Sequence, residues 1–132
     1  MYGVEDRIEF VQANFVEWAR AYPNQSTSQQ PIDVVFCSPP WGGLDYLNNN
    51  LSGPPSAQEY SLDSLQPIPG TELYSLCREL SENVVLYLPR NTSIEEIAAL
   101  DEKELMEVEE AWMSNKLKAL TAYIGKDLTQ AA

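Results

Sequence analysis

The sequence contains no histidine and only two cysteines among its 132 residues. Without histidine, the chain by itself builds no Ser-His-Asp or Cys-His nucleophile and no metal site with a histidine ligand. Cys37 and Cys77 lie far apart and form no CxxC pair, which argues against a zinc site and indicates a reducing compartment. We therefore expect neither histidine-dependent hydrolysis nor a bound metal.

Long hydrophobic runs are also absent. A run such as residues 84–88 is far shorter than the roughly 20 residues that cross a bilayer, so no membrane association is expected. The length suits one domain, because compact domains usually have roughly 100–150 residues. With 44% hydrophobic and 10% aromatic residues, the chain can form a core, which excludes disorder over its whole length.

Positive charge is scarce, with 8 basic residues against 20 acidic ones and a net charge of −12. This balance opposes the long basic grooves that usually bind nucleic acid. Residues 95–110 alone hold eight carboxylates against one lysine, and a solvated helix and turn is the simplest interpretation of that segment. Outside it, Arg90, Lys116 and Lys118 are available for a small positive site.

Hydrophobic periodicity predicts strands that alternate with helices. The predicted strands are 7–12, 32–37, 84–88, 105–112 and 116–124, and the predicted helices are 15–22, 72–82 and one that begins after Ser93 with a Ser-x-x-Glu capping box. The near-continuous apolar run 32–37 is typical of a parallel strand covered on both faces. The last two strands form an antiparallel hairpin, because their link is too short for a parallel crossover.

This order of elements predicts a single α/β domain, residues 1–132, with helices on the faces of its sheet. Residues 44–70 contain four prolines and a run of asparagines. Segments of this length without regular structure are usually functional loops or disordered inserts, so we interpret residues 44–70 as an irregular lid or insert.

Two unusual motifs come directly after buried strands: Ser38-Pro39-Pro40-Trp41 and Pro89-Arg90-Asn91. In open α/β sheets, ligands bind beyond the carboxyl ends of the strands, so both motifs are expected to face one crevice. Consecutive prolines have a fixed φ and no N–H, so the carbonyls of Ser38 and Pro39 can point at a ligand and accept both hydrogens of an exocyclic amine. The purely structural alternative, a stiff strand exit covered by a tryptophan, remains open.

The motifs and the sequence segments around them resemble those of a known enzyme family. An Asn, Asp or Ser followed by Pro-Pro-aromatic resembles the motif of amino-methyltransferases that use S-adenosylmethionine. Three segments, residues 34–46, 87–91 and 115–123, resemble the trimethylguanosine synthase family, which hypermethylates the 7-methylguanosine cap of small nuclear and nucleolar RNAs. The resemblance covers nearly the whole chain and is weakest over residues 48–69.

The resemblance implies a role for each matching residue. Trp41 stacks on the cationic 7-methylguanine, while Ser38 and Pro39 hold the 2-amino group in line with the methyl sulfonium, which is catalysis by orientation. The remaining implied contacts are Arg90 with its neighbour Asn91 for the cap phosphates, Lys116 and Lys118 as helpers, Tyr46 closing over the cap, and Asn14-Phe15 near the adenine of the cofactor, where the family usually has Asp-Phe. Arg90 as a surface ion-pair partner and the two lysines as solvent-facing residues remain alternatives.

The resemblance also implies a class I, Rossmann-like methyltransferase sheet, S-adenosylmethionine as cofactor and 7-methylguanosine-capped small RNA as substrate. It further implies small ribonucleoprotein proteins as candidate partners, a monomer for the full-length family, and a nuclear, nucleolar location with the cytoplasm as a further candidate.

The glycine-rich turn on which the family's cofactor site rests is absent, because no GxG follows a strand in this sequence. We therefore expect the chain to be a C-terminal portion that lacks the first two strands of the family fold. In the family sheet those strands lie between the third and fourth. The predicted strand 7–12 then has no neighbour, and the predicted strand 32–37 has an uncovered edge.

Two other functions compete with cap guanosine-N2 methylation. One is a different amino-methyltransferase that acts on adenine-N6, ribosomal guanine-N2 or a protein amide; Trp41 in place of Tyr or Phe argues against it. The other is a non-catalytic remnant that keeps the fold and cap affinity without turnover.

Overall fold

The structure, a computed structural model, describes residues 3–22, 31–41 and 59–129. Within them, the elements in chain order are the 3-10 helix η1 (Glu5–Arg7), α1 (Phe15–Ala21), β1 (Val35–Cys37), the 3-10 helix η4 (Leu62–Ser64), α3 (Gly70–Leu80), β2 (Val84–Pro89), α4 (Ile94–Ala99), β3 (Met106–Met113) and β4 (Lys116–Ile124). All the predicted helices are present, and four of the five predicted strands form.

The four strands form one mixed sheet in the order β1-β2-β4-β3. β1 runs parallel to β2, with Val35 opposite Val84, and β4 pairs antiparallel with both β2 and β3. The predicted hairpin is confirmed: Ser114 and Asn115 form its turn, and Ser114 has a φ of 56°. The α/β class with a parallel pair and a C-terminal antiparallel hairpin is thus confirmed.

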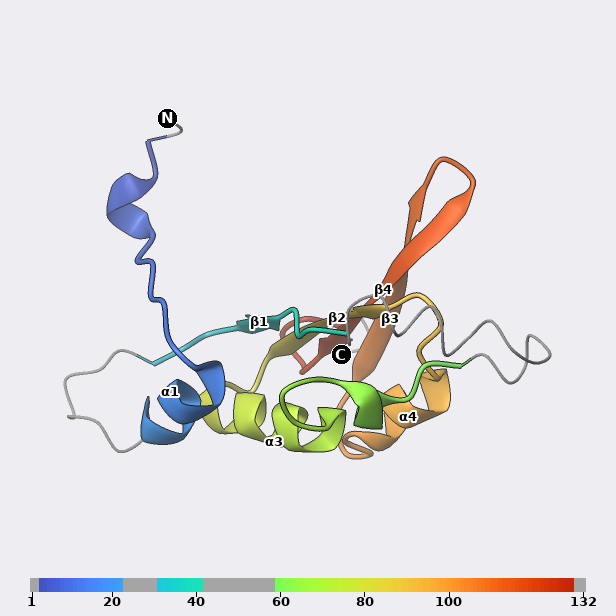
Figure 1. Cartoon of the computed structure of the whole chain (residues 1–132), viewed down its shortest axis with the longest axis horizontal. Helices are drawn as coiled ribbons and strands as arrows, with labels where there is room; N and C mark the ends of the chain where they lie inside the picture. The colour runs from blue at the N-terminus through green and yellow to red at the C-terminus, as the bar shows by residue number, and fades with distance from the viewer. Residues whose placement is uncertain (1–2, 23–30, 42–58, 130–132) are drawn as a thin grey trace.

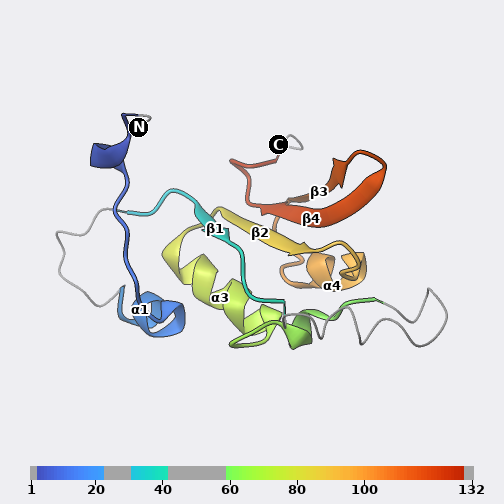
Figure 2. The ribbon, with the colours of Figure 1, turned by 45° about the horizontal axis from the view of Figure 1, so that its top comes forward.

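The helices α1, α3 and α4 lie on one face of this sheet (Figures 1 and 2). Side chains alternate along a strand, and every second residue of β2 points into the core on that side. The core combines alternate residues of β2 and β4 with one face of α3 and one residue of α4: Val84, Leu86, Leu88, Leu120, Ala122, Ile124, Leu73, Cys77 and Ile97. The apolar stripe predicted for the helix at 72–82 is therefore what holds α3 against the sheet.

The opposite face carries no described helix, which corrects the prediction that residues 32–37 are covered on both faces. Only Val35–Cys37 form a strand. Val35 and Cys37 pack against the core, whereas Val34 and Phe36 are exposed, Phe36 by 64%. The apolar run is continuous in sequence, but only every second side chain finds an apolar partner among the described residues.

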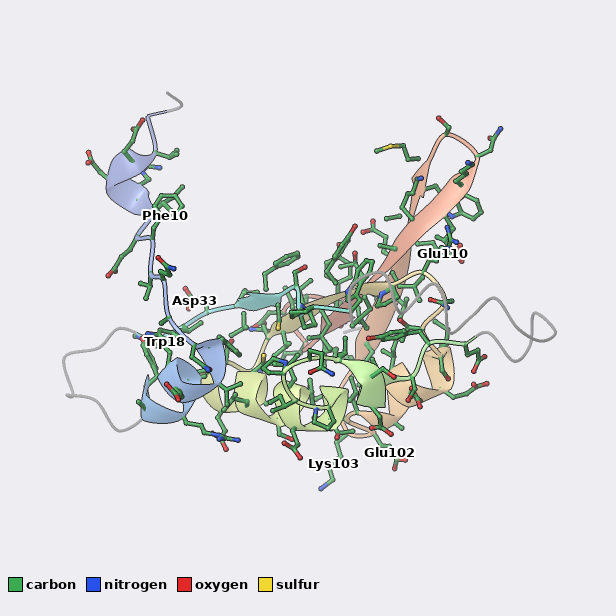
Figure 3. All side chains as sticks on the ribbon, in the orientation of Figure 1. Phe10, Trp18, Asp33, Glu102, Lys103 and Glu110 are labelled. Carbon is green, nitrogen blue, oxygen red and sulfur yellow. The ribbon has the colours of Figure 1, made fainter. Side chains whose placement is uncertain are left out.

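The predicted strand at residues 7–12 is wrong. The 3-10 helix η1 takes its first residue, and the rest is chain without ladder pairing in the described structure. Phe10 is 90% exposed and points away from the packed helices and sheet (Figure 3). We call residues 3–13 the N-terminal arm and residues 59–129 the packed body. A strand needs a hydrogen-bonded neighbour, and no described strand lies beside the arm.

Helices α1 and α4 each begin after a residue whose side chain caps the helix, but the capping box predicted for α4 forms only in part. Asn14 caps α1, its Oδ1 accepting from the Glu17 amide at 3.3 Å. Ser93 caps α4 by accepting from the Glu96 amide at 3.4 Å. The reciprocal half of the capping box does not form, because the Glu96 carboxylate instead accepts from the Leu62 amide at 2.8 Å. Glu96 thereby holds η4 against α4.

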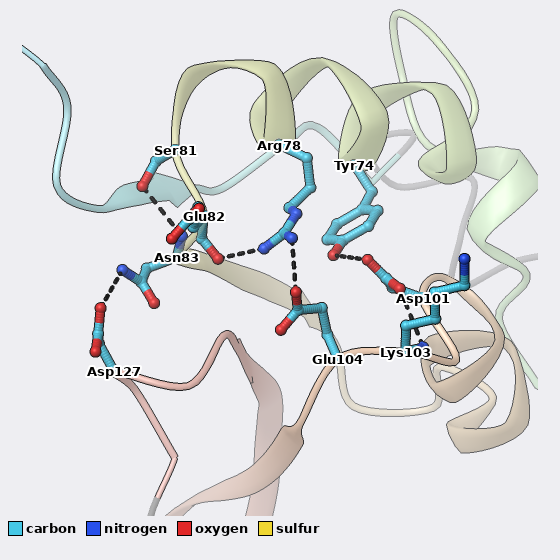
Figure 4. Close-up of polar contacts among 9 residues, drawn as sticks. All are labelled: Tyr74, Arg78, Ser81, Glu82, Asn83, Asp101, Lys103, Glu104 and Asp127. Atoms are coloured by element: carbon cyan, nitrogen blue, oxygen red, sulfur yellow. Dashed lines mark hydrogen bonds and ion pairs between the residues drawn. The ribbon is translucent and has the colours of Figure 1, made fainter. Parts of the chain in front are cut away.

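A group of polar contacts joins the end of α3 to the segments around it (Figure 4). Arg78 forms an ion pair with Glu104 at 2.7 Å and also donates to the Glu82 carbonyl. The Tyr74 hydroxyl donates to Asp101 at 2.9 Å, and burial, followed by this hydrogen bond, raises the pKa of Tyr74. The acidic segment 95–110 is therefore only partly a solvated surface, because some of its carboxylates accept hydrogen bonds from α3.

The irregular segment 44–70 divides into two parts. Residues 44–58 lie outside the described residues, and the remainder packs into the body. Tyr60, Leu62 and Leu65 are buried members of the core. Gly70 begins α3 so close to η4 that a Cβ there would lie 2.7 Å from the Leu62 Cβ, which explains a glycine at this contact.

Candidate functional site

Residues 38–41, which we call the diproline corner, continue from the carboxyl end of β1. Ser38 is exposed, Pro39 is buried, and Trp41 is partly buried where it packs against the edge of the core. The corner therefore lies at the boundary between core and solvent. Part of the indole of Trp41 is therefore exposed to solvent, and its contact with a ligand stays a prediction.

The indole N–H of Trp41 donates to a backbone carbonyl of β2 that would otherwise accept from the strand β1 side of the sheet. The Val35 amide donates to the Asn83 carbonyl at 3.0 Å, and donors along a parallel ladder recur every second residue. Residue 39 is thus the expected donor to the Tyr87 carbonyl, but Pro39 has no N–H. Trp41 Nε1 donates to that carbonyl instead, at 3.3 Å.

The same tyrosine also supports the indole ring. The rings of Trp41 and Tyr87 are stacked, with centroids 5.6 Å apart and planes inclined by 30°. One residue thus gives Trp41 both a hydrogen-bond acceptor, through its backbone carbonyl, and an aromatic neighbour, through its ring. Because the ring is fixed in advance, a ligand that stacks on it loses less of its binding free energy to ordering the side chain.

Tyr60 connects the diproline corner to the turn that follows β2. Its hydroxyl donates to the Trp41 carbonyl at 2.9 Å, and its amide donates to the Asn91 carbonyl at 2.7 Å. Burial raises the pKa of Tyr60, so its hydroxyl keeps the proton that it donates. The two predicted motifs are therefore joined at one end of the sheet. Sequence reasoning missed Tyr60, whose only signal is a single aromatic at the end of a proline-rich segment.

Arg90 and Lys118 each adjoin the last residue pair of the β2–β4 ladder. That pair is Pro89 and Ala119; Arg90 follows it in the turn after β2, and Lys118 precedes it on β4. Both are exposed. Lys118 is also the extra residue of a bulge, since Ala111 pairs with Ala119 and the next residue of β3 already pairs with Leu117. Two exposed cations thus lie near one end of this ladder.

The other predicted residues lie farther from the corner or outside the description. Lys116 lies two residues beyond Lys118 on β4, toward the hairpin turn. Asn14 and Phe15 begin α1, which packs on α3, and the structure does not join them to the corner. Asn14 caps its helix, and its contact with adenine stays a prediction. Tyr46 lies outside the described residues.

The two cysteines, far apart in sequence, lie together behind the corner. Cys37 ends β1, Cys77 lies on α3, and both are free thiols. A hydrogen bond between the thiols lowers the pKa of Cys37 and raises that of Cys77.

Among the residues in the structure, no group of three or more Cys, Asp or Glu side chains gathers as a metal site requires. Over the same residues, no helix has the length and apolarity to span a membrane.

The described residues do not complete a site for S-adenosylmethionine. Gly70 lies in α3 and Gly125 in the turn after β4, so neither is in a glycine-rich turn between a strand and a helix. The diproline corner fits the acceptor side of an amine-methylating site, whereas the described part of the chain holds no counterpart for the cofactor turn.

Comparison with known proteins agrees with this geometry. The sequence model of the family described as RNA cap guanine-N2 methyltransferase matches residues 1–127. The trimethylguanosine synthase of Saccharomyces cerevisiae is 34% identical over 105 residues, which are 79% of this chain and 30% of that protein. The trimethylguanosine synthase of Schizosaccharomyces pombe is 30% identical over 100 residues, which are 75% of this chain and 37% of that protein. The chain thus spans about a third of the length of these relatives, and it belongs to the RNA cap guanine-N2 methyltransferase family.

Proposed function

We propose that this chain forms the cap-binding and amine-holding half of an RNA cap guanosine-N2 methyltransferase. The proposed reaction converts 7-methylguanosine caps of small nuclear and nucleolar RNAs to 2,2,7-trimethylguanosine, with S-adenosylmethionine as methyl donor. Family membership and two relatives named trimethylguanosine synthase support the reaction. A nuclear, nucleolar location and contact with small ribonucleoprotein proteins belong to the same proposal.

The observation that carries the proposal is an indole fixed in advance at the end of the sheet where β2 ends and where Arg90 and Lys118 adjoin the β2–β4 ladder. Trp41 is held by Tyr87 through both its N–H and its ring, and it stacks on the 7-methylguanine. Arg90 and Lys118 take the cap phosphates. The carbonyls of Ser38 and Pro39 accept hydrogen bonds from the 2-amino group, which orients its lone pair toward an electrophilic methyl group.

The acidic composition is compatible with this substrate. A cap requires one stacked base and a few phosphate contacts, so it needs no extended basic groove. The 7-methylguanine ring and the sulfonium of the methyl donor are both cationic, and a net charge of −12 favours their approach.

The first experiment measures binding of 7-methyl-GTP and GTP to the full-length protein and to two Trp41 variants. Trp41→Ala should weaken binding of 7-methyl-GTP by about 1–3 kcal/mol, the usual contribution of a base stacked on an aromatic side chain. Trp41→Phe is the matched control, because it keeps a smaller stacking face and removes the indole N–H. Equal affinity of the wild-type protein for both nucleotides would contradict a methylated cap as the ligand.

The second experiment distinguishes contacts with the cap phosphates from contacts with the base. Arg90→Ala should weaken binding of 7-methyl-GTP more than binding of the 7-methylguanosine nucleoside, because only the nucleotide presents anions to the guanidinium. Isothermal titration of both ligands measures the difference. Equal losses on the two ligands would remove Arg90 from the phosphate site.

A non-catalytic cap-binding module is the second candidate, and the missing cofactor turn favours it for the isolated chain. Transfer of a labelled methyl group from S-adenosylmethionine to capped RNA, measured with the 132-residue chain and with the full-length protein, distinguishes the two. Transfer by the full-length protein alone assigns catalysis to the intact enzyme and cap recognition to this part.

A further inference from the structure

The hairpin of β3 and β4 extends beyond the rest of the sheet (Figures 1 and 2). β2 pairs with β4 only as far as Ala119, whereas β3 continues to pair with β4 as far as Met113 and Lys116. Within the described residues, the end of the hairpin is therefore a two-stranded ribbon without a third strand. We call residues 112–118 the ribbon tip.

The ribbon tip differs in chemistry from the rest of the chain. Residues 111–126 contain three lysines and no acidic residue, although the chain as a whole has 20 acids against 8 bases. At the tip, 58% of Trp112 and 67% of Met113 are exposed. Trp112 Nε1 donates to Glu110 at 3.0 Å, which holds one edge of the indole on β3, the strand that carries Glu110 in Figure 3. Large exposed apolar side chains beside lysines are typical of a binding surface.

The position of the ribbon tip connects it to the proposed cap site. Its base is Lys118, which, like Arg90, adjoins the last pair of the β2–β4 ladder, and its outer end is Lys116 opposite Met113. At roughly 3.3 Å per residue of strand, the tip reaches about 10 Å beyond Ala119. A strand of RNA that leaves the phosphates between Arg90 and Lys118 therefore meets Lys116 and Trp112 next.

We propose that the ribbon tip binds the first nucleotides after the cap as single-stranded RNA. Trp112 stacks on one base and Lys116 contacts a phosphate, a combination that binds single strands without sequence preference. This inference rests on the proposed function, because the cap determines where the RNA begins. The two lysines of the tip and its continuity with the proposed phosphate site favour RNA over a protein as the partner.

The test compares the cap alone with the cap on RNA, using the full-length protein. The ligands are the dinucleotide m7GpppA and an unstructured 12-nucleotide RNA with the same cap, and binding is measured by fluorescence anisotropy over a range of salt concentrations. The wild-type protein should bind the capped 12-mer more tightly than the dinucleotide. Trp112→Ala should weaken 12-mer binding by roughly 5- to 150-fold and leave dinucleotide binding unchanged. Trp112→Phe should retain most of the 12-mer affinity.

Two further variants control the result. Leu105→Ala removes an exposed apolar side chain at the opposite end of the same hairpin and should change neither affinity. Lys116→Gln should reduce the salt dependence of 12-mer binding by about the contribution of one phosphate contact.

Three outcomes would overturn the inference. If wild-type protein binds the 12-mer no more tightly than the dinucleotide, or if Trp112→Ala weakens both ligands equally, the tip is no separate RNA site. An unchanged 12-mer affinity in Trp112→Ala rejects RNA and leaves a protein as the partner of the tip. In each of these cases the dinucleotide still binds the wild-type protein, so the proposed function stands; loss of dinucleotide binding by the wild type overturns both.

Discussion

The N-terminal arm and strand β3 have similar alternating sequences, but only β3 forms a strand. Residues 7–12 and β3 both alternate polar with apolar side chains, and neither is deeply buried. β3 is nevertheless a full strand, because a two-residue turn brings β4 beside it. The arm has no such neighbour among the described residues. Alternation therefore predicts the capacity to form a strand, and a pairing partner decides whether the strand forms.

The largest expected effect comes from truncating a side chain of the packed body and comparing the loss of stability with that for a side chain of the arm. Leu86, in β2, is 2% exposed, and Leu86→Ala should reduce the free energy of unfolding of the 132-residue chain by about 2–5 kcal/mol through lost burial and a cavity. Phe10→Ala is the matched control and should change it by less than about 0.5 kcal/mol. Urea denaturation measures both. A large effect of Phe10→Ala would show that the arm is packed in solution.

A second pair of variants compares the backbone strain caused by replacing a glycine of the packed body with that caused by replacing a glycine of the arm. Gly125 has a φ of +127°, and a Cβ there would lie 2.5 Å from Asn83 Oδ1. Gly125→Ala should therefore reduce stability by about 1–3 kcal/mol. Gly3 also has a positive φ, +69°, but a Cβ there meets nothing within 4 Å. Because the arm can change conformation without disturbing the body, Gly3→Ala should have little effect on the thermal midpoint, and equal shifts for the two variants would refute the contrast.

The smallest expected effect concerns pH and the hydrogen bond between Tyr74 and Asp101. Tyr74→Phe should lose about 1 kcal/mol at neutral pH. The folded pKa of Tyr74 is raised, so the unfolded chain loses this proton first, near pH 10. The stabilisation is therefore fully present below about pH 10 and declines as the pH rises toward the folded pKa. Denaturation between pH 7 and 11 should show a shallower alkaline decline for Tyr74→Phe, and an identical decline would exclude Tyr74 as its source.

Sequence patterns predicted the packed body well because its signals are local and mutually consistent. The buried run of β2, the apolar stripe of α3 and the short link of the hairpin each specify an element without reference to distant residues. The pattern failed at residues 7–12 and overestimated the burial of residues 32–37, because strand pairing and helix cover depend on segments far away in the chain.

At the candidate site, the sequence predicted the motifs but not the contacts that join them. Trp41 and Arg90 were identified as candidates, and the structure places both at the carboxyl end of the parallel pair. The role of Tyr60 had no local signal, because the hydrogen bonds that its hydroxyl and its amide donate reach residues 19 and 31 positions away. The position of Arg90 and Lys118 next to the same ladder pair likewise follows from the register of β2 and β4, which no local pattern specifies.

The two prolines of the corner are not equivalent. Pro39, by lacking an amide hydrogen, leaves the Tyr87 oxygen without a main-chain competitor, so the indole can occupy it. Pro40 contributes its own oxygen, which accepts from the Gln66 amide at 3.2 Å. A residue with an N–H at the first position would compete with Trp41 for the same acceptor and release the ring while the sheet stayed intact. The hydrogen bond that holds the Trp41 indole thus depends on the missing amide hydrogen of Pro39.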